Sequence, residues 1–236
     1  MSETTPRRGF LGRFIGAAAA LGLPIAEFGT TAAAQQAGHD DWLKEVKGAN
    51  RCLFDFPKHL NGFGLAHVFN YLATYTAAYK TGAGQVGAVG TFYGMGPGSS
   101  IAMGFNDAMW AKYALGEYHG LKDASGKPYT RNVFNRPTKA DGHLAAAALQ
   151  TPNFAMLGDM MAGLGIENLQ KMGTTFIMCN NALDGWCVEL EARGKGTAAD
   201  IGKDLRANLL PGVTIVPAMV IAIEKAQAAG IRYNRQ

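Results

Sequence analysis

Gln85–Tyr93 reads QVGAVGTFY, a largely apolar run with Gly84 before it and Gly94 after it. A run of this length that does not alternate between polar and apolar residues is typical of a strand buried on both faces. Strands of that kind belong to parallel sheets, in which helices cover the two faces. This stretch therefore predicts a buried strand of a parallel sheet.

Strands and helices are predicted to alternate on either side of it. Upstream, residues 51–56 (RCLFDF) have the composition of a strand ended by Pro57, and residues 64–79 carry apolar side chains at helical spacings. Downstream, we expect strands at 174–178, 212–216 and 231–233, and helices at 101–115, 143–150, 154–163, 166–171, 184–193, 197–209 and 219–229. This alternation predicts an α/β fold with three layers, α/β/α, and a mainly parallel sheet.

The boundaries of the domain follow from changes in composition. Residues 35–49 form a polar lead-in with a short helix expected at 41–47, and one domain is expected over 50–236. Residues 116–142 are polar, contain Gly, Pro and Asn, and show no period, so we expect a long loop there. A loop of that length in a compact domain is often functional.

The first 34 residues have the parts of an export signal. Arg7 and Arg8 are followed by Gly-Phe-Leu, a short apolar run covers 14–26, and three alanines end the segment at Ala34. Paired arginines before such a run predict a twin-arginine signal peptide and a periplasmic protein. The run is shorter than the roughly 20 residues that span a bilayer, so no membrane attachment is expected after cleavage. An uncleaved anchor is the alternative.

The charge of the chain argues against nucleic acid as a partner. The chain has 22 basic and 18 acidic residues, and removal of residues 1–34, which hold three of the former and two of the latter, leaves a net charge of +3. No basic cluster stands out, whereas nucleic-acid-binding domains concentrate positive charge on one face.

The cysteines and histidines predict neither a redox dithiol nor a metal centre. The chain contains only Cys52, Cys179 and Cys187, with no C-x-x-C and no C-x-x-C-H, and its histidines lack zinc-ligand spacing. No cofactor is therefore expected. A disulfide between Cys179 and Cys187 is excluded if the residues between them are helical, since that separates them by roughly 12 Å along the axis. If the residues between them form a loop, the disulfide is possible. Of the two alternatives, we expect no disulfide.

Ligands of open parallel sheets bind beyond the carboxyl ends of the strands. Cys179, at the end of the 174–178 strand, is the sharpest candidate, because a thiol at a strand-to-helix turn faces backbone N–H groups and a positive helix end. The amides of Asn180 and Asn181 are candidate donors to a sulfur anion. The alternative is a buried structural cysteine, which is common.

Two further candidates follow earlier strands. The loop from Gly94 through Gly96 and Gly98 to Ser100 lies between a strand and a helix, where phosphate loops lie, but it is neither G-x-G-x-x-G nor a Walker sequence. It is an anion-binding turn or a plain tight turn. Asp55 is a ligand-binding carboxylate or a polar turn residue before Pro57. His59 and His67 are expected to serve packing or to lie at the surface. His119 and His143 flank the long loop and are weaker candidates for a pocket.

Three motifs together resemble the DsrE/DsrF-like family, in particular its exported members. They are the Cys-bearing turn at 176–183 (FIMCNNAL), the strand and helix start at 210–220 (LPGVTIVPAMV) and the end at 227–233 (QAAGIRY). The resemblance covers about 50–115 and 165–235, and relative to that family residues of about 116–150 are an inserted segment. It implies a three-layer α/β/α fold, assembly into homo- or hetero-oligomers, and sulfur carried as a persulfide on a cysteine at the position of Cys179.

Two functions follow from these observations as hypotheses. In the first, the protein handles sulfur in the periplasm, and Cys179 takes sulfane sulfur from a small sulfur compound and passes it to a protein acceptor. In the second, it is a non-catalytic protein that binds a small ligand or a redox partner, through the glycine loop and the inserted segment. A structural subunit of a larger assembly is a third option. Exposure of Cys179 in an electropositive pocket favours transfer, and burial among apolar side chains favours binding or structure.

Overall fold

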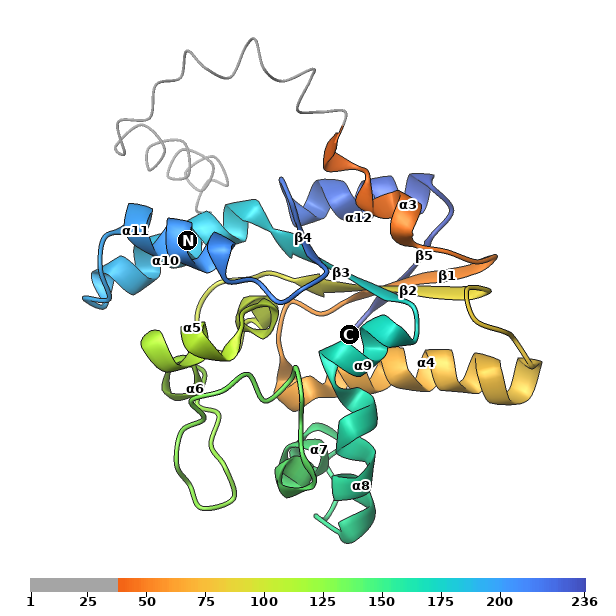
Figure 1. Ribbon diagram of the computed structural model, residues 1–236, viewed down its shortest axis with the longest axis horizontal. Helices are drawn as coiled ribbons and strands as arrows, with labels where there is room; N and C mark the ends of the chain where they lie inside the picture. The colour runs from red at the N-terminus through yellow and green to blue at the C-terminus, as the bar shows by residue number, and fades with distance from the viewer. Residues whose placement is uncertain (1–37) are drawn as a thin grey trace, which may run out of the picture. The chain divides into compact units, whose positions relative to one another are not determined.

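The computed structural model describes residues 38–236 (Figure 1). The predicted signal peptide, residues 1–34, lies outside the described residues. Of the lead-in, a short helix α3 (Trp42–Glu45) is described where the sequence predicts one at 41–47. The lead-in is polar in composition, yet it contributes to the core, because Trp42 and Val46 are buried against the sheet.

Five parallel strands form one sheet in the order β4-β3-β2-β1-β5. The stretch QVGAVGTFY supplies the central strand, every residue of which is buried. The strands are β1 (Asn50–Asp55), β2 (Val86–Phe92), β3 (Thr174–Cys179), β4 (Val213–Val216) and β5 (Arg232–Arg235). All five predicted strands are confirmed, and the last of them lies at an edge of the sheet as expected.

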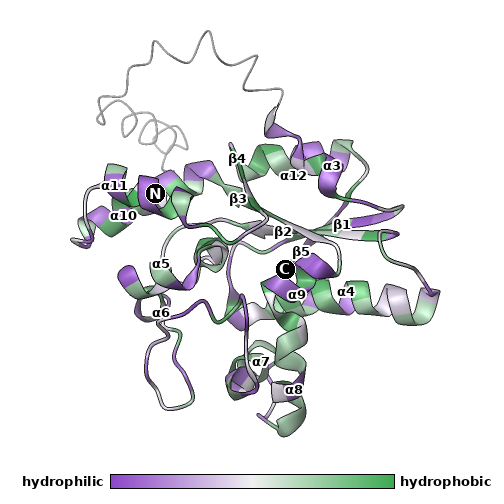
Figure 2. Cartoon of the chain, in the orientation of Figure 1, coloured by the Kyte–Doolittle hydropathy of each residue, from purple (hydrophilic) through white to green (hydrophobic). Residues whose placement is uncertain are grey.

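Helices cover both faces of the sheet, so the predicted three-layer α/β/α fold is confirmed (Figure 1). One face carries α3 and α12 (Met219–Ala228), which bury the aliphatic side chains of the strands beneath them. The other face carries the larger core, to which the long helix α4 (Phe63–Tyr79), α9 (Ile166–Lys171), α10 (Asn180–Ala192) and α11 (Ala198–Ala207) contribute. Figure 2 shows hydrophilic and hydrophobic residues mixed along α10 and α11, as in helices with one exposed and one buried face.

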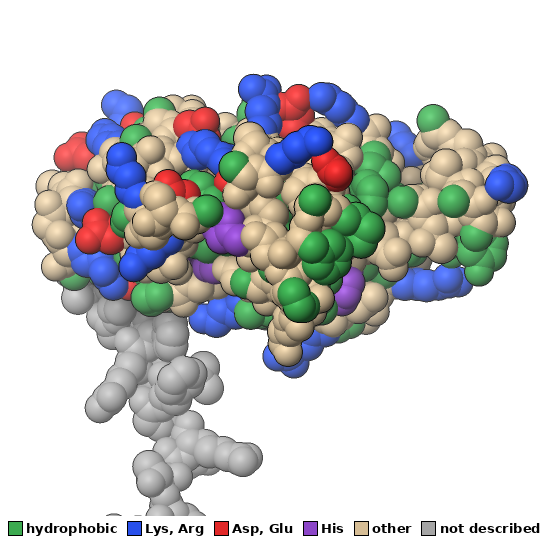
Figure 3. Space-filling model, turned by 90° about the horizontal axis from the view of Figure 1, so that it is seen from below, with side chains coloured by type: hydrophobic (Ala, Val, Ile, Leu, Met, Phe, Trp, Pro, Cys, Tyr) green, Lys and Arg blue, Asp and Glu red, His purple; other side chains and the backbone are tan. Residues whose placement is uncertain are grey.

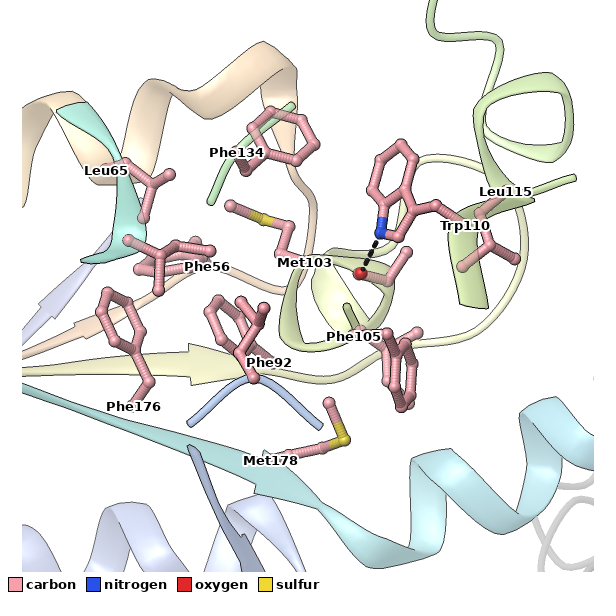
Figure 4. Close-up of a cluster of buried hydrophobic side chains, with 14 of the residues drawn as sticks. Phe56, Leu65, Phe92, Met103, Phe105, Trp110, Leu115, Phe134, Phe176 and Met178 are labelled. Carbon is pink, nitrogen blue, oxygen red and sulfur yellow. Dashed lines mark hydrogen bonds between the residues drawn. The ribbon is translucent and has the colours of Figure 1, made fainter. Parts of the chain in front are cut away.

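Aromatic side chains fill the larger core (Figure 4). Phe92 and Phe176, from neighbouring strands, stack with ring centroids 5.0 Å apart, and Phe56 meets Phe92 edge-on. The indole of Trp110 donates a hydrogen bond of 2.9 Å to the Ala102 carbonyl, so this fully buried ring leaves no polar atom without a partner.

The single helix predicted at 101–115 is wrong. The chain forms a 3₁₀ segment η3 (Ser100–Gly104), then α5 (Asp107–Lys112) and α6 (Leu115–Tyr118). Asn106 begins a new helix, because its side chain accepts a hydrogen bond from the Met109 N–H, as N-cap residues do. Ala114 has φ of 52°, a left-handed conformation that ends α5. Apolar spacing alone does not reveal such caps.

The predicted loop at 116–142 is largely irregular chain, yet it is not a solvated loop. After α6 it runs to the 3₁₀ segment η4 (Lys139–Asp141), and Leu121, Val133 and Phe134 are buried on the way. Gly116 allows this packing, because a Cβ at that position would lie 2.1 Å from the Tyr129 carbonyl oxygen. Residues 116–150 therefore add to the core.

Two short helices, α7 (Gly142–Ala148) and α8 (Ala155–Leu164), complete the layer around the inserted segment, close to where the sequence predicts helices. Figure 3 shows hydrophobic side chains gathered on this side of the molecule, and Leu149, Phe154 and Met156 are exposed there. An apolar crevice lies between the two helices and the start of α4, and its lining includes Leu65, Phe134, Leu144, Met161 and Leu164.

Candidate functional site

The carboxyl ends of the central strands bring two of the predicted site residues onto one face of the sheet. Successive residues of a strand point to opposite faces. Leu53, Val89 and Ile177 all pack in the layer beneath α3 and α12. The residues two positions later on the three strands therefore face the same side, and they are Asp55, Thr91 and Cys179.

Asp55 is a buried carboxylate surrounded by hydroxyl groups. It is 4% exposed. Its Oδ1 accepts a hydrogen bond of 3.3 Å from the Thr91 hydroxyl, and its Oδ2 accepts one of 2.7 Å from the Tyr233 hydroxyl. The phenol of Tyr93, just beyond the end of β2, also lies beside this carboxylate. Burial of a carboxylate requires such partners, and here Thr91 of β2 and Tyr233 of β5 supply them.

The two tyrosines of this cluster are held in the protonated form. Burial raises the pKa of Tyr93 above its ordinary value, and the Asp55 carboxylate raises it further. For Tyr233 the hydrogen bond to Asp55 is the main cause of a raised pKa. Arg235, the register partner of Asp55 on β5, partly opposes both shifts. Both phenols are therefore hydrogen-bond donors at neutral pH.

Cys179 lies at the end of β3 as predicted, and its side chain is 6% exposed. Its neighbours in the hydrophobic cluster are mainly aliphatic, among them Val216 and Met219. It is the N-cap residue of α10, and its Sγ accepts a hydrogen bond of 3.3 Å from the Met219 N–H at the start of α12. The sulfur thus lies at the N-termini of two helices but is shielded from solvent.

The other two cysteines are also buried, and all three are free thiols. The expected absence of a bond between Cys179 and Cys187 is confirmed, because α10 begins at Asn180 rather than at the predicted residue 184 and holds the two apart. Burial raises the pKa of the Cys187 thiol to about 11 and raises that of Cys52. Both are core residues with the neutral thiol favoured.

Asn180 and Asn181 are placed differently from Cys179. The Asn180 amide donates a hydrogen bond of 2.8 Å to Asp184 and accepts one of 2.9 Å from Arg206. It therefore ties α10 to α11 at the surface. The backbone N–H of Asn181 bonds the Pro217 carbonyl, and its side chain is exposed. A role for either amide at the sulfur stays a prediction without a contact to support it.

The glycine loop has left-handed backbone at Gly94, Gly96 and Gly98. At Gly94 the conformation is required by a close approach, since a Cβ there would lie 2.8 Å from the Pro57 carbonyl oxygen. The Gly96 N–H donates to the Glu189 carboxylate at 3.3 Å, and the Gly98 N–H donates to His119 Nδ1 at 3.1 Å. Two backbone N–H groups of the loop that could bind an anion are therefore already bonded to side chains of this chain.

Sequence reasoning underestimated His59 and His119, both of which lie beside this loop. They are 8% and 7% exposed, and their ring centroids are 5.6 Å apart. Burial lowers the pKa of His59 to about 4 and that of His119 to about 3. By contrast, the half-buried ring of His143 bonds the Lys122 carbonyl, and His67 bonds Gln236. His59 and His119 are 60 residues apart in the chain, so no local sequence pattern could predict that they are in contact.

Comparisons with known proteins leave the family open. No family model, no curated protein and no solved structure matches this chain. Within residues 38–236, no group of three or more His, Cys, Asp or Glu side chains is arranged to hold a metal ion. No helix in this range is both long and apolar enough to cross a bilayer.

Proposed function

We propose that this chain is an exported, DsrE-like protein that binds a small molecule beyond the carboxyl ends of β1, β2 and β5, without a transfer reaction. The observation that supports this best is the buried Asp55 carboxylate with its ring of hydroxyl groups. Polar groups that converge at this edge of a parallel sheet are where ligands of such folds bind. The burial of Cys179 among aliphatic side chains favours this function over sulfur transfer.

The chemistry of the edge suggests the class of ligand. Tyr233 is 41% exposed, so the hydroxyl that it extends to Asp55 is the replaceable one. A ligand with a hydroxyl or amine can donate to Asp55 in its place, and an acidic group of the same ligand can pair with Arg235 beside it. Small hydroxy acids and amino acids have both groups, and we propose a ligand of that class. A second copy of the chain is the proposed assembly partner.

The test is to isolate the protein with its ligand. The full chain is expressed in a bacterium with a twin-arginine route, and the periplasmic fraction is purified. An N-terminus at Gln35 supports export and cleavage. Native mass spectrometry is expected to show a co-purifying small molecule. In Asp55→Asn its affinity is expected to fall about 10- to 100-fold, since a hydrogen bond to a charged group contributes about 1.5–3 kcal/mol.

The matched control is Asp123→Asn, which changes a carboxylate in an exposed turn whose hydrogen bonds go to Ser125 and Lys127. It is expected to retain the ligand. A wild-type protein free of any small molecule, or equal occupancy in Asp55→Asn and the control, contradicts the proposal.

A second candidate function is the carriage of sulfur on Cys179, and one contact favours it. The Met219 N–H donates to Sγ, and N–H groups at helix N-termini stabilise anionic sulfur. In this reaction the Cys179 thiolate attacks a sulfane sulfur of a polysulfide. A new S–S bond forms on Cys179, an S–S bond of the polysulfide breaks, and a polysulfide shorter by one sulfur leaves with the electron pair.

Sulfur loading separates the two candidates. The folded protein is incubated with polysulfide and analysed by intact-mass and peptide mass spectrometry, with Cys179→Ser in parallel. Because the thiol is 6% exposed, we expect Cys179 to stay unmodified while the protein is folded. If the wild type gains one sulfur on Cys179, a thiol reductant removes it and Cys179→Ser lacks it, the result supports sulfur carriage and contradicts the binding function.

A further inference from the structure

The histidine pair lies on the other face of the sheet from Asp55 and Cys179, in a separate polar cluster. His59 follows β1, and His119 follows α6. Their rings meet edge to face. The indole of Trp186 from α10 lies 6.0 Å from the His119 ring, and the fully buried Ser99 pairs with Lys58, the neighbour of His59.

The backbone decides which nitrogen of each ring carries the hydrogen. His59 Nδ1 accepts a hydrogen bond of 3.1 Å from the Asn61 N–H, and His119 Nδ1 accepts one of 3.1 Å from the Gly98 N–H. A neutral imidazole accepts with one nitrogen and donates with the other. Both rings are neutral at pH 7, because burial lowers each pKa far below 6.5. Both Nε2 atoms therefore carry a hydrogen.

These hydrogens have no acceptor within the described part of the chain. His59 Nε2 and His119 Nε2 are buried polar atoms without a hydrogen-bond partner there, and so are Trp186 Nε1 and Tyr118 Oη beside the His119 ring. The His119 backbone interacts with the His59 ring, but it does not meet hydrogen-bond geometry at Nε2. A buried donor without an acceptor costs roughly 1–3 kcal/mol, and here two such imidazole donors belong to rings whose centroids are 5.6 Å apart.

The Nε2–H groups of the two rings can bind hydrogen-bond acceptors such as anions, but they cannot bind cations. A metal ion needs a lone pair on Nε2, and in both rings that position holds a hydrogen. The charges of Lys58 and Arg193 act on the His119 ring, so the cluster is electropositive on that side. The nearby Glu189 carboxylate is engaged by the Gly96 N–H and by Arg193 at 3.4 Å.

We propose that His59 and His119 form a binding site for a small inorganic oxyanion of the phosphate or sulfate type. The two imidazole N–H groups donate to its oxygens. The glycine loop covers His119 through the Gly98 contact, and its Met95 is half exposed, so displacement of this loop admits the anion. This site is independent of the ligand proposed at Asp55.

The test is calorimetric titration of the mature protein at pH 7 with sodium phosphate and sodium sulfate, at ionic strength matched with sodium chloride. We expect saturable binding of an oxyanion and none of Zn²⁺. Asparagine places its amide oxygen where histidine has Nδ1, so His59→Asn and His119→Asn keep the acceptor for the backbone N–H and lose the Nε2 donor. Each variant is expected to bind at least about 10-fold more weakly. His143→Asn, at a half-buried ring outside this cluster, is expected to bind as wild type.

A second measurement needs no variant. Long-range ¹H–¹⁵N spectra of the imidazoles are expected to show both buried rings as Nε2–H tautomers, with these signals shifted by phosphate or sulfate but not by chloride. The proposal is overturned if no oxyanion binds saturably, if the two histidine variants bind as tightly as the His143 control, or if either ring proves to be the Nδ1–H tautomer.

Discussion

Acidification from pH 7 to pH 5 is expected to lower the free energy of unfolding by about 3–4 kcal/mol, with His59 and His119 as the cause. In the folded protein, burial lowers the pKa of His59 to about 4 and that of His119 to about 3. In the unfolded chain both titrate near 6.5. The unfolded state therefore binds more protons at pH 5, which favours unfolding.

The window of this effect follows from the two pKa values. The stabilisation from each neutral ring is complete above about pH 6.5 and is lost as the pH falls from there toward the folded-state pKa. At pH 5 the difference between the folded and unfolded states amounts to about 2 kcal/mol for each ring. Carboxylates such as Asp141 and Asp204, whose pKa values are lowered in the folded state, add to the loss only at still lower pH.

Urea unfolding at pH 7, 6 and 5 measures the effect, in buffers that contain neither phosphate nor sulfate. The double variant His59→Asn/His119→Asn is expected to lose most of the pH dependence, whereas His143→Asn is expected to retain it. Equal slopes for the wild type and the double variant would show that the histidines are not the titrating groups.

The second large effect is expected at Asp141. Asp141→Ala should reduce the free energy of unfolding by about 3–5 kcal/mol, because it removes the buried partner of the half-buried Arg131 and leaves the Tyr129 hydroxyl and the Thr138 N–H without their acceptor. Asp141 is 2% exposed. Its carboxylate accepts from Arg131 at 2.6 Å, from the Tyr129 hydroxyl at 2.6 Å, and from both the N–H and the hydroxyl of Thr138.

These contacts explain both the state of the carboxyl and its structural role. Burial alone would raise the pKa of Asp141, but hydrogen bonds from Tyr129, Thr138 and Arg131 outweigh it and lower the pKa. The carboxylate therefore ties η4 to the irregular chain before it. That chain includes Phe134, which packs against His59 with ring centroids 5.5 Å apart.

Urea unfolding of Asp141→Ala, Asp141→Asn and Asp123→Ala measures this role. Asp141→Asn keeps the shape but lacks the charge for Arg131, so an intermediate loss is expected. Asp123 binds only turn groups at the surface, and its replacement should cost far less. If Asp141→Ala were no more destabilising than Asp123→Ala, the inserted segment would be held by its apolar contacts alone.

Elements of the fold were predicted correctly where the local sequence pattern reflects the environment that the element has in the folded chain. The stretch QVGAVGTFY is a strand because both of its faces are covered, and its composition already indicates that. Residues 166–171 form a helix with the predicted bounds. The prediction of one helix over 101–115 was wrong, because apolar periodicity continues through the whole segment. The side-chain cap of Asn106 and the left-handed Ala114 divide it.

The order of strands and helices, the fold class and the place of Cys179 at a strand end could be predicted, because each depends on neighbours within a few residues. Only the folded chain brings Asp55 to Tyr233 and His59 to His119, and only there do Met219 and Val216 shield Cys179. Those contacts join residues 60 or more positions apart in the first two cases. Strand register and helix packing, rather than local spacing, set such contacts, and they determine burial and therefore the charge state of each group.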